Sequence, residues 1–101
     1  MSGADALQPV VDDIGDHRFV LERDGGVAEL VYRVNGKRLV LVHTWVPETL
    51  RHQQIGSQLV RAAIERAATE GLTVVPLCSY ARKWLKAHPE ATATVAIDWG
   101  T

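Results

Sequence analysis

The turn at residues 47–57 carries the residue types of an anion-binding site. It precedes a segment with helical periodicity, and the first turn of a helix presents unpaired backbone N–H groups and the positive end of the helix dipole. Arg51 and His52 add side-chain donors, and Gly56 allows a ligand to approach the backbone closely. These features predict a cradle for phosphate or pyrophosphate. Taken alone, the same residues are better explained as an ordinary loop between a strand and a helix, because most helix starts bind nothing.

Two further side chains have the chemistry for proton transfer or nucleophilic attack. Cys78 lies between an apolar segment and a second predicted helix, where the helix dipole favours the thiolate. His43 lies within an apolar segment and is the best general-base candidate of the chain, because histidine is the side-chain type suited to proton transfer near neutral pH. Strand alternation would place His43 on the same face as Leu41 and Trp45.

Both of these residues also have a purely structural interpretation. A lone cysteine is usually a small buried apolar residue, and a histidine in an apolar strand is usually a hydrogen-bonded core or edge group. A hydrolase pair of Cys78 with His43 or His88 would need an oxyanion hole, for which the sequence has no motif. We therefore rank the structural interpretation of Cys78 before a role for its thiol.

The composition describes one small domain without a metal or nucleic-acid signature. The chain has 101 residues, of which 47% are hydrophobic and 23% charged, and its net charge is −1. This balance gives no overall field that would attract nucleic acid or an anionic membrane. One cysteine and four scattered histidines offer no zinc-binding spacing. We expect a cytoplasmic protein whose thiol is reduced.

Residues 1–16 are predicted to be a flexible acidic leader. They contain four Asp and no Lys or Arg, and they lack a sustained hydrophobic period. Residues 17–101 are then predicted to form a single domain.

Hydrophobic periodicity predicts a mixed α+β fold. The predicted elements, in chain order, are strands at 17–23, 27–34 and 37–46, a helix at 56–70, a strand at 72–77, a helix at 79–88 and an edge strand at 93–99. Asn35-Gly36 is a strong hairpin signal, so the first three strands are expected to form an antiparallel meander. Gly71 and Pro89 are expected to end the two helices. Because a helix joins them, the strands at 37–46 and 72–77 are expected to run parallel.

Three segments, taken in this order, resemble a known family. The segments are His43-Thr44-x-Val46-Pro47, Leu50-Arg51 with Ile55-Gly56-Ser57, and Val75-Pro76-Leu77-Cys78-Ser79-Tyr80-Ala81 with His88-Pro89-Glu90. Over residues 17–90 the chain resembles the acetyl-CoA-binding half of the GNAT N-acetyltransferases, and most closely a branch of small GNAT-like proteins. The resemblance implies a GNAT-like mixed sheet, in which the meander is followed by helix, strand and helix.

The resemblance also implies acetyl-CoA as the cofactor and transfer of its acetyl group to an amine. In this family the pantetheine arm pairs with the strand before the turn, and main-chain amides of the turn hold the pyrophosphate. The implied cofactor-binding residues are Thr44, Trp45, Val46, Arg51, His52, Gln53, Gln54, Ile55, Gly56, Ser57 and Tyr80. His43 is the implied base or pantetheine neighbour, and Cys78 the implied acid or nucleophile.

The sequence departs from the family pattern at the turn and in the last helix. Gln54 stands where the motif has its first glycine, so a positive φ at this position would strain the backbone. In larger members the last helix carries a tyrosine acid seven residues after an Asn, and these positions are here Leu85 and Cys78. The proton donor would therefore have to be Cys78 or Tyr80.

The chain also lacks room for two helices that shape the amine pocket in larger members. Asp24-Gly25-Gly26 is a tight turn where those helices would be inserted. An open acceptor side suits a lysine of a protein or peptide better than an enclosed metabolite. The alternatives are a CoA-binding module without turnover, acting as a sensor or partner subunit, and an interaction domain that binds neither ligand.

Overall fold

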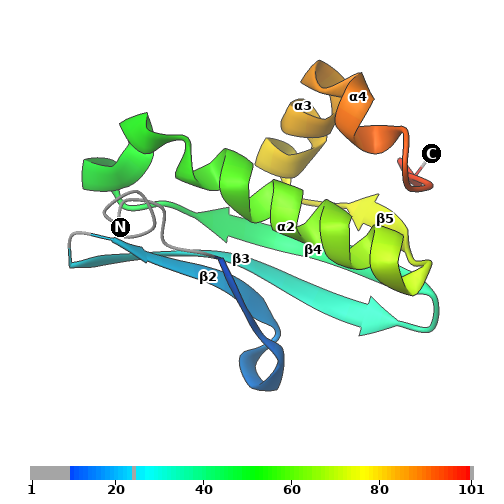
Figure 1. Cartoon of the computed structure of the whole chain (residues 1–101), viewed down its shortest axis with the longest axis horizontal. Helices are drawn as coiled ribbons and strands as arrows, with labels where there is room; N and C mark the ends of the chain where they lie inside the picture. Colours follow the sequence, from blue (N-terminus) through cyan, green and yellow to red (C-terminus); the bar gives the residue numbers. More distant parts are fainter. Residues whose placement is uncertain (1–9, 24, 101) are drawn as a thin grey trace, which may run out of the picture.

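The computed structural model describes residues 10–23 and 25–100, which form a sheet and a layer of helices (Figure 1). In these residues the sheet has five strands, which follow one another across it in chain order. They are β1 (Val11–Asp13), β2 (Arg18–Arg23), β3 (Gly26–Asn35), β4 (Arg38–Trp45) and β5 (Thr73–Pro76). Strands β1 to β4 pair antiparallel, and β5 runs parallel to β4, which confirms the predicted meander and the predicted parallel strand.

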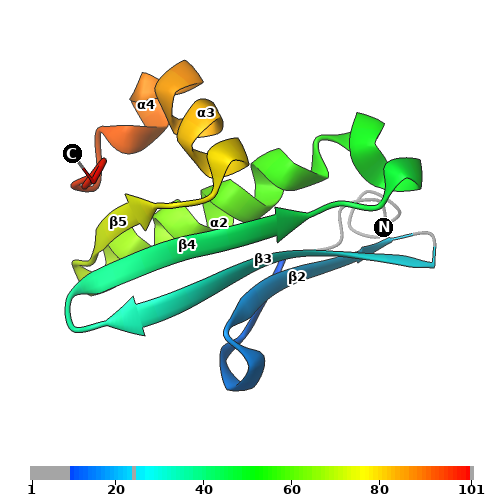
Figure 2. The same cartoon turned by 180° about the vertical axis from the view of Figure 1, so that it is seen from behind.

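The helices cover one face of this sheet. They are α2 (Ile55–Glu70), α3 (Ser79–Ala87) and α4 (Pro89–Thr92). Two 3-10 helices lie in connections: η1 (Ile14–Asp16) joins β1 to β2, and η2 (Glu48–Gln53) lies between β4 and α2. Within the described residues no helix lies over the opposite face, which Figure 2 shows from behind. Arg23 pairs with Gly26, so the connection between β2 and β3 holds no helix. The amine-pocket helices of larger family members are therefore missing, as predicted.

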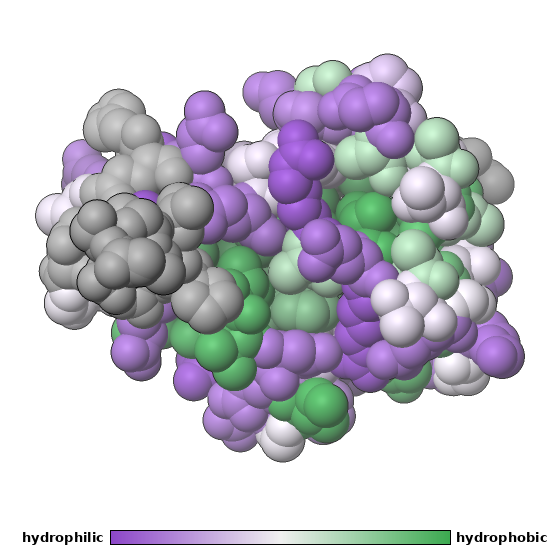
Figure 3. All heavy atoms as spheres, viewed as in Figure 1, coloured by the Kyte–Doolittle hydropathy of each residue, from purple (hydrophilic) through white to green (hydrophobic). Residues whose placement is uncertain are grey.

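The core lies between α2, α3 and the covered face of the sheet. Its strand residues are Phe19, Leu21, Ala28, Leu30, Tyr32, Leu39, Leu41 and Val74, and its helix residues include Leu59, Val60, Ala63, Ile64, Ala67, Ala81, Trp84 and Leu85. The helical positions recur every three or four residues, which is the spacing that presents one apolar stripe to a sheet. Hydrophilic side chains lie along the outward surface of α2 (Figure 3). No helix in the described part of the chain is long and apolar enough to cross a membrane.

A β-bulge changes which face each side chain of β4 occupies. Tyr32 of β3 pairs with Leu41, but the next residue back, Val31, pairs with His43, so Val42 is an extra residue in β4. One extra residue exchanges the two faces beyond it. Thr44, the cross-strand partner of Leu30, therefore lies on the face that the helices cover. His43 lies on the other face of the sheet, which we call the open face. The expectation that His43 shares a face with Leu41 is wrong for this reason.

Two predictions about the ends of the chain need correction. The expected leader ran through residue 16, yet Val11–Asp13 form a strand paired with β2 and Ile14–Asp16 form a 3-10 helix; residues 1–9 lie outside the described residues. The expected edge strand at 93–99 is reduced to a single bridge between Val74 and Ile97. Pro89 follows the end of α3, as predicted, and also occupies the first turn of α4.

Candidate functional site

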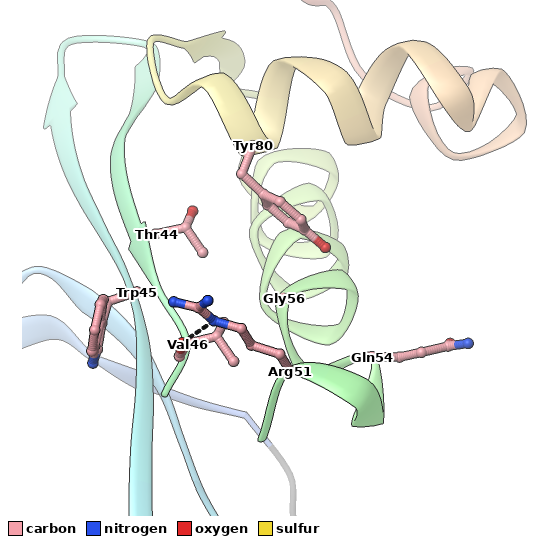
Figure 4. Close-up of a pocket in the computed structure, with 7 residues that line it drawn as sticks. All are labelled: Thr44, Trp45, Val46, Arg51, Gln54, Gly56 and Tyr80. Carbon is pink, nitrogen blue, oxygen red and sulfur yellow. Dashed lines mark hydrogen bonds between the residues drawn. The ribbon is translucent and has the colours of Figure 1, made fainter. Parts of the chain in front are cut away.

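A pocket of about 340 Å³ lies where the chain passes from β4 to α2 (Figure 4). Its lining residues come from the end of β4, the connection that follows it, the first turn of α2 and the first turn of α3. They are Thr44, Trp45, Val46, Arg51, Gln54, Gly56 and Tyr80. All seven belong to the set that the family resemblance implied.

The end of β4 diverges from β5 beside this pocket. Parallel pairing ends at Leu41 and Pro76, and the N–H groups of Leu77 and Cys78 both donate to the Leu41 carbonyl at 3.0 Å. Strand β4 continues to Trp45 without a β5 residue in register. On its β5 side, the backbone at Thr44 and Trp45 is thus open to an extended ligand, which could pair with it as a further strand would.

The start of α2 forms the opposite side of the pocket. Among the side chains that the structure describes, none caps this helix, and its first turn has no acidic residue. The first backbone N–H groups therefore retain their hydrogen-bonding capacity and the positive end of the dipole. An anion in the pocket would meet donors and a favourable field, which is the physical basis of the predicted pyrophosphate cradle.

Gln54, the residue before α2, adopts the left-handed conformation, with φ 56° and ψ 32°. This conformation brings η2 and α2 together at a sharp turn, and in Figure 4 the Gln54 side chain points away from the other pocket residues. A β-carbon is disfavoured at positive φ, so the turn is strained in the way the missing glycine predicted.

Glycine at position 54 should raise the free energy of unfolding by about 0.5–1 kcal/mol, because relief of left-handed strain exceeds the extra entropy of an unfolded glycine. Chemical denaturation of wild type and Gln54→Gly measures this difference. Gln54→Ala is the matched control, since it removes the side chain but keeps the β-carbon. An equal gain for both variants would assign the effect to the glutamine side chain instead of backbone strain.

Tyr80 covers the first turn of α2. A β-carbon added to Gly56 would lie 2.7 Å from the Tyr80 hydroxyl and 2.8 Å from its ring carbon, so this close contact requires glycine. Burial raises the pKa of the Tyr80 phenol, and Cys78 adds to the shift. The phenol therefore keeps its proton at neutral pH and can donate a hydrogen bond into the pocket. Sequence reasoning placed Tyr80 in the site but missed this contact, which depends on how α3 docks onto α2.

Arg51 and Ser57 are held by specific contacts. The Nε of Arg51 donates to the Val46 carbonyl at 3.1 Å, which ties the turn to the end of β4 (Figure 4). The Ser57 hydroxyl accepts a hydrogen bond from the indole N–H of Trp84 at 2.9 Å. Trp84 in turn stacks on His88, with ring centroids 4.0 Å apart. The Ser57–Trp84 bond fixes α3 against the start of α2, a link for which the sequence gave no signal.

Other predicted site residues occupy supporting positions. Ile55 is buried under the first turn of α2. His52 and Gln53 form the last part of η2, and their side chains lie outside what the structure describes.

The structure separates the two candidate catalytic residues. Cys78 is 8% exposed on the helix side of the sheet, and its Sγ lies 3.1 Å from the Oγ1 of Thr44. His43 is exposed on the open face. His88 lies at the end of α3 that is opposite to Cys78, and its Nδ1 contacts the Trp84 carbonyl. Neither histidine therefore forms the Cys–His pair of a hydrolase with Cys78.

A mixed sheet whose parallel pair opens beside an uncapped helix start is the architecture of the GNAT acetyltransferases. The family model described as GCN5-related N-acetyl-transferase matches residues 18–95, and the chain belongs to this family.

Individual relatives agree with this assignment. Protein NATD1 from Danio rerio is 38% identical over 63 residues, which are 61% of this chain and 57% of that protein, so the match spans little more than half of that relative. The solution structure of a GCN5-like protein from Staphylococcus aureus superposes with a TM-score of 0.67 at 26% identity. That superposition covers 85% of this chain and 88% of the other.

Proposed function

We propose that this protein binds acetyl-CoA in the pocket between β4 and α2 and transfers the acetyl group to an amine. One observation carries the proposal: the end of β4, which has no partner strand on its β5 side, and the uncapped start of α2 line a single pocket. The strand end offers backbone groups to the amides of the pantetheine arm. The helix start offers N–H donors to the pyrophosphate, with Arg51 at its rim.

Acetyl-CoA supplies an activated thioester, and the protein must manage two protons. The protonated amine loses one to a base before its nitrogen attacks the carbonyl carbon, and the sulfur gains one from a donor as the C–S bond breaks. The further proton that the nitrogen releases on bonding restores the donor. His43, on the open face, is the proposed base for the first. Cys78, on the helix side where β4 and β5 diverge, is the proposed donor for the second. Tyr80, whose phenol lines the pocket, is the alternative donor.

A CoA-binding module without turnover is the second candidate. It is favoured by Leu85, which is 1% exposed in the core at the position where larger family members carry a tyrosine acid. Transfer of acetyl to any amine excludes this alternative.

Calorimetric titration with acetyl-CoA and with CoA should give saturable binding, and Arg51→Ala should weaken it about tenfold through loss of a charged hydrogen-bond donor. Arg33→Ala is the matched control, because it removes the same charge from an exposed position on β3, outside the pocket lining. Its affinity should equal that of wild type.

Two results would contradict different parts of this proposal. If Arg51→Ala and Arg33→Ala weakened the affinity for acetyl-CoA equally, the loss would come from the change in net charge, and Arg51 would not be a binding residue. No binding at millimolar acetyl-CoA would reject the proposed function itself.

A further inference from the structure

Acidic and basic side chains lie on different parts of the open face of the sheet. Strand alternation places Asp13, Arg18, Glu22 and Glu29 on this face, toward β1 and β2. Arg18 contacts Glu29 at 2.8 Å and Asp13 at 3.6 Å. With Glu22 there are three negative charges and one positive charge, so the guanidinium offsets only part of the negative charge. Arg33 lies on the same face but near the opposite end of β3, where it pairs with Val40. The part of the open face nearer β1 and β2 is therefore acidic.

This acidic part is also hollow and partly apolar. A depression of about 520 Å³ lies across β1 and β2, lined by Val11, Asp12, Asp13, Ile14, Arg18, Val20 and Glu22. Val11 is 58% exposed and Ile14 65% exposed. Carboxylates beside exposed aliphatic groups match a segment that carries both positive charges and apolar side chains.

The same face continues to the proposed site of acetyl transfer. Trp45 pairs with Glu29 across the strands, and Glu29 pairs with Val20, so one row of side chains runs from β4 to β2. Because of the bulge, His43 and Trp45 both lie on this face, and Figure 4 shows Trp45 pointing away from Thr44. Trp45 is 49% exposed and also lines the pocket. An amine that crosses the open face would reach the pocket past an aromatic ring and the proposed base.

We propose that the open face is the acceptor surface and that the acceptor is a lysine in a positively charged, extended protein segment. This inference rests on the proposed function and specifies its substrate. The carboxylates attract the segment, the aliphatic groups contact its apolar side chains, and Trp45 receives the lysine by a cation–π contact before His43 takes a proton from the ammonium group. The nitrogen then attacks the thioester from the face opposite Cys78.

Transfer to two synthetic peptides tests the proposal. Both contain one central lysine and alternating leucines, with arginine at the remaining positions of one and glutamate in the other. Wild type should acetylate the arginine peptide at least tenfold more efficiently. Glu22→Lys should lower kcat/KM for that peptide about fivefold, through KM, and should leave the affinity for acetyl-CoA unchanged.

Glu65→Lys is the matched control for Glu22→Lys. It makes the same charge change at an exposed position on α2, on the helix side. Its kcat/KM should stay within twofold of wild type. Any of three results would contradict the proposed acceptor surface. They are an equal loss of kcat/KM in the two variants, equal rates for the two peptides, and a preference for free lysine over both peptides.

Amide chemical shifts locate the peptide without requiring turnover. Titration of the arginine peptide into ¹⁵N-labelled protein should perturb the amides of β2 and the ends of β3 and β4, and Glu22→Lys should reduce these changes. Shifts confined to α2 and α3 would reject the surface even if acetyl-CoA binds. Shifts on β2 to β4 in a protein that fails to bind acetyl-CoA would support the surface and reject the proposed function, so the two failures are distinguishable.

Discussion

Alanine at position 78 is expected to lower the rate of acetyl transfer about a hundredfold while leaving the affinity for acetyl-CoA within about twofold of wild type. The Sγ of Cys78 lies 3.1 Å from Thr44 Oγ1, at the point where β4 and β5 diverge. A thiol held there can protonate the departing sulfur, but it is not among the residues that line the pocket. Steady-state kcat with a lysine peptide, and calorimetry with acetyl-CoA, measure the two effects separately.

Conservative variants at the same contact distinguish proton donation from packing. Thr44→Val keeps the shape of residue 44 but removes the hydroxyl that contacts the thiol, so it should lower kcat less than Cys78→Ala does. Tyr80→Phe tests the other donor. If Cys78→Ala retains full kcat and Tyr80→Phe does not, the donor is Tyr80 and Cys78 is a structural residue.

Mass spectrometry distinguishes a covalent role for the same thiol. In a nucleophilic mechanism the Cys78 thiolate attacks the acetyl carbon, CoA leaves as the thiol, and the protein gains one acetyl group before any amine is added. Proton donation predicts no such adduct. A Cys78 acetyl adduct that an amine discharges would therefore replace the proton-donor role by a nucleophilic one.

Local signals explain why most of the fold could be predicted from the sequence. The stripe from Leu59 to Ala67 has a helical period, and Gly71 follows it with a φ of 68° and an N–H that bonds to the Ala67 carbonyl. The meander is similarly encoded by strand alternation and by Asn35-Gly36, where Gly36 has a φ of 63°. Each of these features depends on residues close together in the chain.

Features that depend on distant residues could not be predicted. Alternation continues through Leu41, His43 and Trp45, and only the pairing with β3 reveals the extra residue Val42. Strand β1 is short and acidic, so its composition resembles that of a leader. Its place in the sheet depends on contacts of Asp12 with residues far along the chain.

Some features of the candidate site also depend on local sequence, and others depend on contacts between distant residues. The pocket residues of the turn lie close together in the sequence, so a local motif could group them, and the missing glycine predicted the strained backbone at Gln54. The contact of Tyr80 with Gly56 and the bond from Trp84 to Ser57 join two helices. These contacts depend on the angle at which α3 packs, which no local pattern encodes.

The stability of the protein is expected to fall by about 2–3 kcal/mol as the pH rises through the interval from 10 to 12, and Tyr32 is the cause. Tyr32 is 1% exposed, and its hydroxyl contacts Asp12 of β1 and accepts a hydrogen bond from Arg66 of α2 at 2.7 Å. Burial, followed by the hydrogen bond to Asp12, raises the pKa of Tyr32 from 10.0 to about 12. The folded state therefore retains a proton that the unfolded chain releases above pH 10, so the contribution is complete below pH 10 and is lost as the pH passes 12.

Urea denaturation of wild type and Tyr32→Phe at pH 8 and at pH 11.5 isolates this contribution. The other ionisable groups are common to both proteins, so their effects cancel in the difference between the two pH dependences. Tyr80→Phe is the matched control, because Tyr80 is the only other tyrosine of the chain and is 41% exposed. It should keep most of the alkaline loss, whereas Tyr32→Phe should remove it. The same alkaline loss in all three proteins would show that β1 is held to the sheet without a protonated phenol between Asp12 and Arg66.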